Sequence, residues 1–375
     1  MIKSLFSLLS PQGPKGRLTI LLFHKIPKIA DGLTPSEPDV AWFEQTLDFL
    51  QEHLNVLSLS EAVSALKRGN LPRRSVAITL DDGYSDWLET VAPALQKRNL
   101  PATFFVSTEQ LAGPALWHER IVAAVRALPN HGVSLPFGFG SYTDLSDYLS
   151  RIRLITELQE RLKYAPLRDR LNAIAAIEAQ AISALELPKR FNASSVRDLH
   201  SQGFEIGAHT VRHPILNECT DQEAMEEIGG CREELEAAIG GHVTSFAYPN
   251  GRPGKDYNGT HVEMVKACGY KVAVATCNGA ATILSDVFQL PRFSPWGVAS
   301  NRMALQLIRN LFEPTKVVKS LKSNKVYAEK SNVKCLFIAS AFPPIHGGSA
   351  VVYGSLCADL PAGTIRVLAP KKNYL

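Results

Sequence analysis

Hydrophobic residues along this 375-residue chain fall into short apolar runs that alternate with longer amphipathic segments. The apolar runs have the length of buried strands, and the segments between them repeat apolar residues every three or four positions, as helices do. Strands are predicted at Leu18–Phe23, Asn55–Leu59, Ser75–Leu80, Ala102–Val106, Phe204–Ala208, Val243–Tyr248, Tyr270–Thr276 and Val287–Leu290, and helices at Val40–His53, Ser60–Arg68, Ser85–Arg98, Asp221–Ile239 and Thr260–Cys268. This alternation predicts an α/β protein with a mainly parallel sheet, either open or closed into a barrel.

The alternation stops over Thr143–Leu187, where no strand is predicted. Apolar residues recur there at spacings of three and four, at Leu167, Leu171, Ile174, Ile177, Ala181 and Leu185. Such a stripe predicts amphipathic helix, and therefore a helical insertion at about 143–190 between two core strands. Insertions of this kind often build the rim of a site, although a packed decoration is an equal alternative.

The pattern changes again near the C-terminal end. Residues 1–312 are expected to form the main domain, and the lysine-rich, weakly periodic stretch 313–332 a linker. Residues 333–375 then predict a strand at Cys335–Ala339, a glycine-containing loop, a helix and a strand at Ile365–Leu368. This is one Rossmann-like βαβ unit, which is too short to bury both faces of a parallel sheet.

Composition narrows the classes of function. The hydrophobic content of 45% and charged content of 20% are ordinary for a globular protein, and the net charge of +4 includes no long basic run, so no nucleic-acid partner is expected. The six cysteines form no metal-binding or disulfide pattern, which favours buried thiols in a reducing compartment. The N-terminus lacks a full signal sequence, and no apolar run spans a bilayer, so a cytoplasmic protein is expected, with no firm evidence for membrane insertion. Weak membrane association through the first ten residues is left open. No feature defines an oligomeric state.

Two groups of polar residues follow apolar runs. Asp81 and Asp82 end one run and precede Gly83, and His209 and His213 follow another. One carboxylate with two imidazoles suits a divalent metal, and the second carboxylate can serve as a base. One helical turn is expected to bring the two histidines to the same face. Each group has a plainer interpretation, a helix-capping turn or a pair of surface histidines, but their combination favours a metal-assisted hydrolase.

Three segments carry a family resemblance. Thr79–Gly83, His209–His213 and Phe246–Gly251 resemble, in order, the three motifs of the polysaccharide deacetylases, carbohydrate esterase family 4. The resemblance covers roughly 18–296. It implies a distorted (β/α) barrel of seven strands and the metal-dependent removal of N-acetyl groups from amino sugars, often with zinc.

The resemblance also implies roles. Asp81 would be the general base, and Asp82, His209 and His213 would bind a divalent metal, with zinc expected. Many members have an arginine that orients the base where this chain has Ala247. Arg292 is the nearest candidate to replace it, unless it is an ordinary surface arginine at a strand end.

The general acid and the substrate contacts complete the set. In the family that the chain resembles, a histidine late in the sequence usually supplies the general acid, and this chain lacks it. His24 directly follows the first predicted strand. Family members that deacetylate biofilm poly-N-acetylglucosamine have a histidine at a similar early position. His24 is therefore expected to protonate the leaving amine, with a structural role as the alternative. Substrate contacts are expected from Tyr248 and Asn250 of the third motif, and from Trp117 and Trp296, which could equally be core residues.

The C-terminal residues have a resemblance of their own. Ala341–Ala350 resembles the start of a family 4 glycosyltransferase of the GT-B type, and only its first βαβ unit, so no transferase activity is expected. The predicted function is metal-dependent hydrolysis of an N-acetyl group from an amino sugar in a glycan or lipid-linked glycan intermediate, as in cell-surface polysaccharide biosynthesis. The alternatives are an amidase for another N-acyl group and a non-catalytic sugar-binding domain that positions a glycosyltransferase.

Overall fold

The computed structural model of the protein describes residues 2–111, 115–135, 138–188, 191–295, 300–319, 335–338 and 365–368. The chain divides into two compact units, Met1–Leu321 and Lys322–Leu375. In the second unit, β10 (Cys335–Ile338) and β11 (Ile365–Leu368) pair in parallel, in agreement with the two strands predicted there. The loop and helix expected between them, and the glycosyltransferase-like segment, lie outside the described residues.

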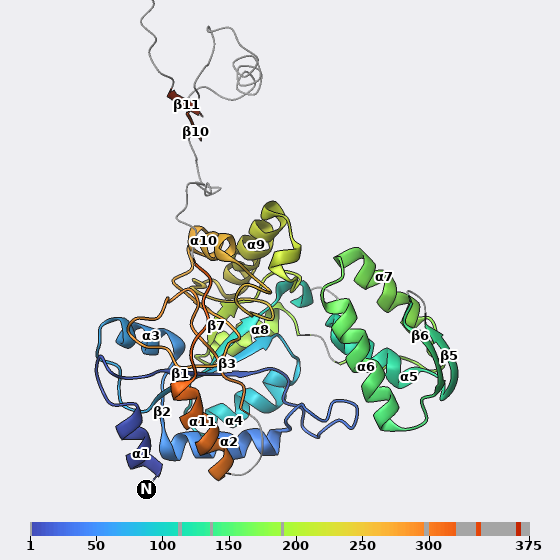
Figure 1. Cartoon of the computed structure of the whole chain (residues 1–375), viewed down its shortest axis with the longest axis horizontal. Coiled ribbons are helices and arrows are strands. Elements are labelled where there is room, and N and C mark those ends of the chain that lie inside the picture. The colour runs from blue at the N-terminus through green and yellow to red at the C-terminus, as the bar shows by residue number, and fades with distance from the viewer. Residues whose placement is uncertain are drawn as a thin grey trace, which may run out of the picture. The chain divides into compact units, whose positions relative to one another are not determined.

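A parallel sheet of seven strands forms the centre of the first unit (Figure 1). Its strands follow the order β1–β3–β4–β7–β8–β9, with β2 paired to β3. Their bounds are β1 Thr19–Phe23, β2 Asn55–Val56, β3 Ser75–Asp82, β4 Thr103–Val106, β7 Glu205–Ala208, β8 Ser245–Ala247 and β9 Val272–Val274. Most of these strands are buried along their whole length, which is why they appear in the sequence as continuous apolar runs. The predicted α/β fold with a parallel sheet is confirmed.

The first and last strands of the sheet are linked by one short segment. Leu290 exchanges backbone hydrogen bonds with β9, and Phe293 does the same with β1. The sheet is therefore curled, as in a (β/α) barrel. The strand predicted at Val287–Leu290 is wrong, because Leu290 makes only an isolated bridge to Val274.

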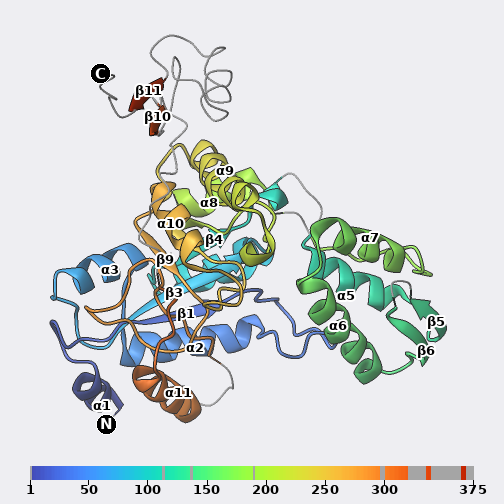
Figure 2. The same ribbon diagram turned by 45° about the horizontal axis from the view of Figure 1, so that its top comes forward.

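Helices surround the curled sheet (Figure 2). They are α1 Ile2–Leu9, α2 Val40–His53, α3 Leu59–Lys67, α4 Ala92–Gln96, α8 Ala193–Ser201, α9 Asp221–Ile239, α10 Gly259–Ala267 and α11 Ser300–Phe312. Ser58 and Glu61 form a capping box that starts α3 at Leu59, so the strand predicted to reach Leu59 ends early. The single helix predicted over Ser85–Arg98 divides into a π-helical turn at Trp87–Val91 and α4. None of the described helices combines the length and apolar character that crossing a bilayer requires.

The insertion lies between β4 and β7 and forms a lobe beside the sheet in both views. It consists of α5 Trp117–Ala127, an antiparallel hairpin of β5 His131–Leu135 and β6 Gly140–Asp144, α6 Tyr148–Lys163 and α7 Leu167–Glu178. It has its own core, which includes Ile121, Leu154, Leu158, Ile174 and Ile177. It starts earlier than predicted, at α5, a helix that was not predicted from the sequence. The hairpin that follows α5 was also missed, because it is mostly exposed and gives almost no apolar signal. The helical stripe also ends early, since α7 stops at Glu178.

Candidate metal and catalytic site

The two adjacent aspartates lie at the carboxyl end of β3. Asp81 and Asp82 remain in register with Phe105 and Val106 of β4, and the two carboxylate-bearing residues are only 2% and 4% exposed. Asp82 has a φ of 90° and Gly83 a φ of 106°, so the chain turns sharply where the strand ends. A non-glycine residue rarely adopts such a φ, and strain of this kind is concentrated at functional sites.

The two histidines lie in a tight loop after β7, not on a helix. Thr210 and His213 have φ values of 65° and 52°, and the Oγ1 of Thr210 accepts a hydrogen bond from the His213 amide at 3.1 Å. Glu227 of α9 holds the loop by accepting from the backbone and the side chain of Arg212 at 2.8 and 2.6 Å. The predicted helical turn is therefore wrong, but the loop still brings the imidazoles together, with ring centroids 4.8 Å apart.

Asp82, His209 and His213 form a group that could hold a metal ion. Their potential ligand atoms all lie within 4.8 Å of one another. The Nε2 atoms of both histidines are 3.3 Å from the same oxygen, Oδ1 of Asp82. Two imidazoles and one carboxylate make up a familiar donor set for a divalent ion that keeps further positions open.

The surroundings of the two imidazoles fit such an ion. Nδ1 of His209 is 2.7 Å from the carbonyl oxygen of Ala247. A carbonyl can only accept, so Nδ1 carries a proton. Burial lowers the pKa of His209, but Asp81 and Asp82 outweigh it and raise that pKa, so a cation beside Asp82 would displace the proton of Nε2 and take its lone pair. Burial lowers the pKa of His213 to about 3, against the opposing effect of Asp82. His213 is therefore neutral near pH 7, as a metal ligand must be.

Asp81 faces a different partner, Arg292. Two parallel hydrogen bonds of 2.6 Å join the guanidinium to the two carboxylate oxygens, and Arg292 is only 1% exposed. The guanidinium also donates to Thr79 and lies over the ring of Phe105. Arg292 reaches this position because Leu290–Phe293 crosses from β9 to β1. It is not the surface arginine of the alternative interpretation.

The two aspartates are held in different charge environments. Burial raises the pKa of Asp81, but Arg292 and His209 outweigh it, so the pKa lies below its usual value. At Asp82, burial again raises the pKa, but His209 and His213 outweigh it, so the pKa of Asp82 lies well below its usual value. Both groups are ionised near pH 7, one beside a guanidinium and the other beside two imidazoles.

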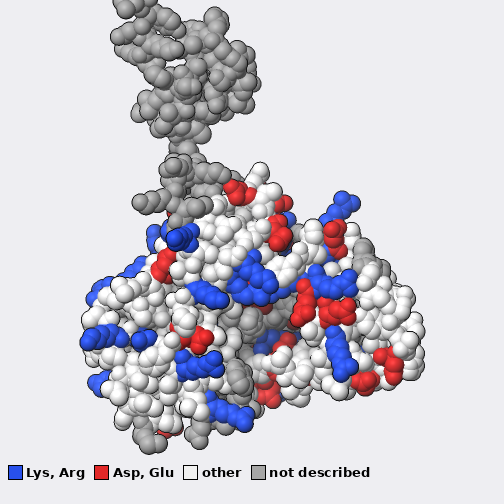
Figure 3. All heavy atoms as spheres, in the orientation of Figure 1, with Lys and Arg blue, Asp and Glu red and all other residues white. Residues whose placement is uncertain are grey.

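An open cleft of about 430 Å³ lies over these residues. One wall comes from strand ends and loops of the sheet, and the other from α5 and α6 of the insertion. The surface is hollowed between the two (Figure 3). The insertion is therefore part of the site, and not only a packed decoration. The lining consists of His24, Glu37, Asp81, Asp82, Tyr84, Trp117, His118, Thr156, Gln159, Glu160, Lys163, His209, His213 and Asn250.

The other predicted site residues fall into three groups. His24, Asn250 and Trp117 line the cleft. Tyr248 needs a correction: it is fully buried, stacks on Tyr257 at a centroid distance of 3.9 Å and donates its hydroxyl to a backbone carbonyl, so it is a core residue that no substrate can reach. Trp296 lies outside the described residues.

Seven of the residues that line the cleft were not predicted from the sequence, and two of them, Tyr84 and His118, lie directly beside the metal-binding group. The Tyr84 hydroxyl is 3.0 Å from Oδ2 of Asp82 and 2.7 Å from Nε2 of His118. Burial lowers the pKa of His118 to about 4, so its neutral ring can donate to the tyrosine oxygen while Tyr84 donates to Asp82. The position of Tyr84 directly after Asp-Asp-Gly was a usable signal, whereas nothing local marks His118.

Comparison with known proteins identifies the family of this chain. The family model described as polysaccharide deacetylase matches residues 68–165 and 172–273. The chain therefore belongs to the polysaccharide deacetylase family, hydrolases that remove acetyl groups from carbohydrates.

Individual relatives are distant. The chain is 22% identical over 278 residues to YxkH of Bacillus subtilis, whose name places it among the polysaccharide deacetylases; the match covers 74% of this chain and 70% of that protein. Two solved structures share the fold. The deacetylase PplD of Streptococcus pyogenes, solved with acetate, has a TM-score of 0.51 and 20% identity, covering 80% of this chain and 99% of PplD. IcaB from Ammonifex degensii has a TM-score of 0.50 and 16% identity, covering 79% and 97%.

Proposed function

We propose that this protein hydrolyses an N-acetyl group of an amino sugar and needs a divalent metal, most simply zinc, to do so. The observation that carries this proposal is the division between two adjacent carboxylates. Asp82 faces two imidazoles, while Asp81 faces Arg292 and lies 3.7 Å from Nε2 of His209. One carboxylate is placed to bind a cation, and the other is left ionised beside it.

The residues then have separable roles. Asp82, His209 and His213 would hold a divalent cation, which would supply Lewis-acid chemistry at the amide carbonyl and make bound water more acidic. Asp81 accepts a proton from the water whose oxygen bonds to the carbonyl carbon. As the carbon–nitrogen bond breaks, His24 protonates the leaving amine, so acetate and a free amino sugar result.

Arg292 would act through Asp81. Its two hydrogen bonds fix the plane of the carboxylate and hold it ionised, which keeps the base ready and in one orientation. This is the role that the resemblance gives to an arginine at the position of Ala247. In this chain Arg292, which lies 45 positions after Ala247 in the sequence, would take that role from another part of the sheet.

The cleft supports a saccharide substrate. It is open and is lined by polar groups, including Asn250, with Trp117 as an aromatic residue at the insertion. Such a mixture suits the hydroxyl edges and the apolar face of a pyranose. A glycan or lipid-linked glycan intermediate of cell-surface polysaccharide biosynthesis remains our proposal for the substrate.

Separating the two aspartates tests the proposal. Metal content and acetate release from N-acetylglucosamine oligomers are measured for Asp81→Asn, Asp82→Asn and the double variant His209→Ala/His213→Ala. Asp82→Asn should weaken metal binding and the double variant should abolish it, whereas Asp81→Asn should keep the metal and lose about a hundredfold or more in turnover. Equal metal loss in both asparagine variants would refute the division of roles. A metal-loaded wild type that binds the oligomers without releasing acetate would refute deacetylation.

A further inference from the structure

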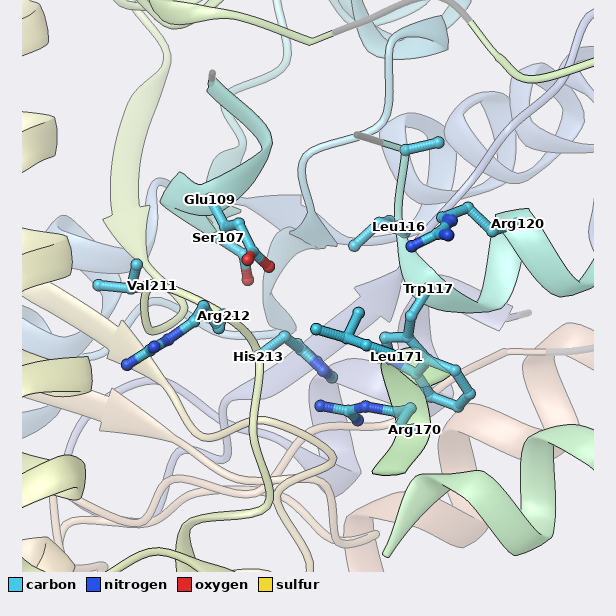
Figure 4. A pocket seen from close by; sticks show the side chains of 11 residues that line it. Ser107, Glu109, Leu116, Trp117, Arg120, Arg170, Leu171, Val211, Arg212 and His213 are labelled. Atoms are coloured by element: carbon cyan, nitrogen blue, oxygen red, sulfur yellow. The ribbon is translucent and has the colours of Figure 1, made fainter. Parts of the chain in front are cut away.

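A second, smaller cavity of about 40 Å³ adjoins the cleft beside His213 (Figure 4). The loops after β4 and β7 line it from the sheet, and α5 and α7 line it from the insertion. His213 and Trp117 line both spaces, so the cavity and the cleft are neighbours. A space of this size can hold a few water molecules or one small polar group.

Three arginines line the cavity, and two of them have carboxylate partners. Arg120 makes two hydrogen bonds to Glu178, at 2.8 and 2.7 Å. Arg212 bonds Glu227 at 2.6 Å, and its guanidinium points away from the cavity in Figure 4. Their charges are therefore satisfied within the fold.

The third arginine, Arg170, is different. It is only 4% exposed, yet among the described residues it makes no ion pair, and its Nε has no hydrogen-bond partner. Its guanidinium lies 5.1 Å from the ring centroid of Trp117 and points toward the side chain of His213. The one carboxylate in the cavity, that of Glu109, is not in an ion pair with it.

An unpaired buried guanidinium is costly. Removing an ion from water without a partner costs several kcal/mol, and a cation–π contact returns only about 0.5–2 kcal/mol of this. A purely structural arginine at this place would be expected to have a carboxylate, as Arg120 and Arg212 do. The missing partner therefore points to an anion supplied from outside the fold.

We propose that this cavity is a subsite for an acidic substituent, a carboxylate or a phosphate, that the substrate carries close to the N-acetyl group. The guanidinium of Arg170, 5.1 Å from the centre of the Trp117 ring, presents the planar fork that matches both groups. The position beside His213 places this group next to the reacting amide, so the inference rests on the proposed function. Glu109 lines the same cavity and disfavours an anion, which confines the acidic group to the side of Arg170.

The first test compares substrates. The neutral substrate is an N-acetylglucosamine tetrasaccharide. The phosphate probe is the same tetrasaccharide with a phosphate at its reducing end. The carboxylate probe is a tetrasaccharide of alternating N-acetylglucosamine and glucuronic acid. The wild type should prefer at least one acidic probe by about tenfold or more in kcat/KM, and Arg170→Met should lose that preference. Arg168→Met, which removes an exposed charge from the same helix, is the matched control and should keep it. Equal kcat/KM values for all three probes in the wild type would overturn the proposal.

The second test measures binding without turnover. Inorganic phosphate or glucuronate should raise the Tm of the wild type and of Arg168→Met, and should raise the Tm of Arg170→Met less. Phosphate that binds at the metal site instead would raise the Tm of all three proteins equally. The probe that shows this difference identifies the acidic group. Without added anion, Arg170→Met should melt at the same temperature as the wild type or higher, because it removes an unpaired charge. A Tm lower by several degrees would show a structural role and overturn the proposal. An Arg170-dependent shift in Tm without acetate release from any probe would support the subsite and refute the proposed deacetylation.

Discussion

Replacing Arg292 with methionine should destabilise the protein and disable Asp81 together. The two side chains are 1% and 2% exposed and share two hydrogen bonds of 2.6 Å. Removing one partner of such a pair leaves the other charge buried and unpaired, which typically costs about 3–5 kcal/mol. His209 lies 3.7 Å from Asp81 but does not replace the two hydrogen bonds of the guanidinium, so we expect a loss of about 3 kcal/mol or more in the free energy of unfolding.

The double variant Arg292→Met/Asp81→Asn separates the pair from simple loss of packing. With both charges gone, neither is left buried alone, so the double variant should be more stable than the sum of the single losses predicts, by about 2 kcal/mol or more. Urea unfolding, with and without bound metal, measures these values. Arg309→Met is the control, since Arg309 is 83% exposed and its bridge to Glu313 should contribute less than about 1 kcal/mol.

Additive losses, within about 0.5 kcal/mol, would refute this reasoning, because they would mean that the two charges do not depend on each other. Acetate release gives a second readout. Arg292→Met should lose at least about tenfold in kcat while it keeps its metal, since Arg292 contacts Asp81 and not the metal-binding group. Loss of the metal with full activity per bound ion would contradict the proposed positioning role.

Three further predictions concern other parts of the site. His24→Ala should lose most activity on an N-acetyl sugar but much less on an activated acetate ester, whose leaving group needs no proton; equal losses on both would exclude His24 as the acid. Tyr84→Phe removes a hydrogen bond to Asp82 and should weaken metal binding by about 10- to 100-fold in a competitive chelator titration, and an unchanged affinity would refute this support. Burial, opposed by the Ile26 amide, raises the pKa of Asp86 from 3.8 to about 7. Between these pH values the unfolded chain releases this proton and the folded chain keeps it. The free energy of unfolding therefore falls, by up to about 4 kcal/mol, as pH rises from about 4 to about 7. Asp86→Asn should remove that loss, becoming more stable than the wild type at pH 8 but not at pH 4, and a gain of the same size at both pH values in urea unfolding would contradict it.

Local signals in the sequence determined much of the fold. Helices α2 and α9 have the predicted bounds because Asp39 and Thr220 cap their first turns, and Gly240, with a φ of 65°, ends α9. The strands β1 and β3 were recognisable because both faces of a parallel strand are buried and their residues are continuously apolar. Asp81 and Asp82 were recognisable for the same reason, since they stand where such a run ends.

Only the tertiary structure decided how the site is assembled. Arg292 and Asp81 are 211 residues apart, and they meet because Leu290–Phe293 hydrogen-bonds to both β9 and β1. His118 reaches Tyr84 because the insertion packs beside the sheet. Tyr248 is buried on Tyr257, although Asn250 of the same motif lines the cleft. Periodicity and capping depend on residues within a turn or two of each other, so the sequence shows them directly. The partner of a buried charge depends on strand order and on the path of the chain between strands, and those exist only once the sheet has formed.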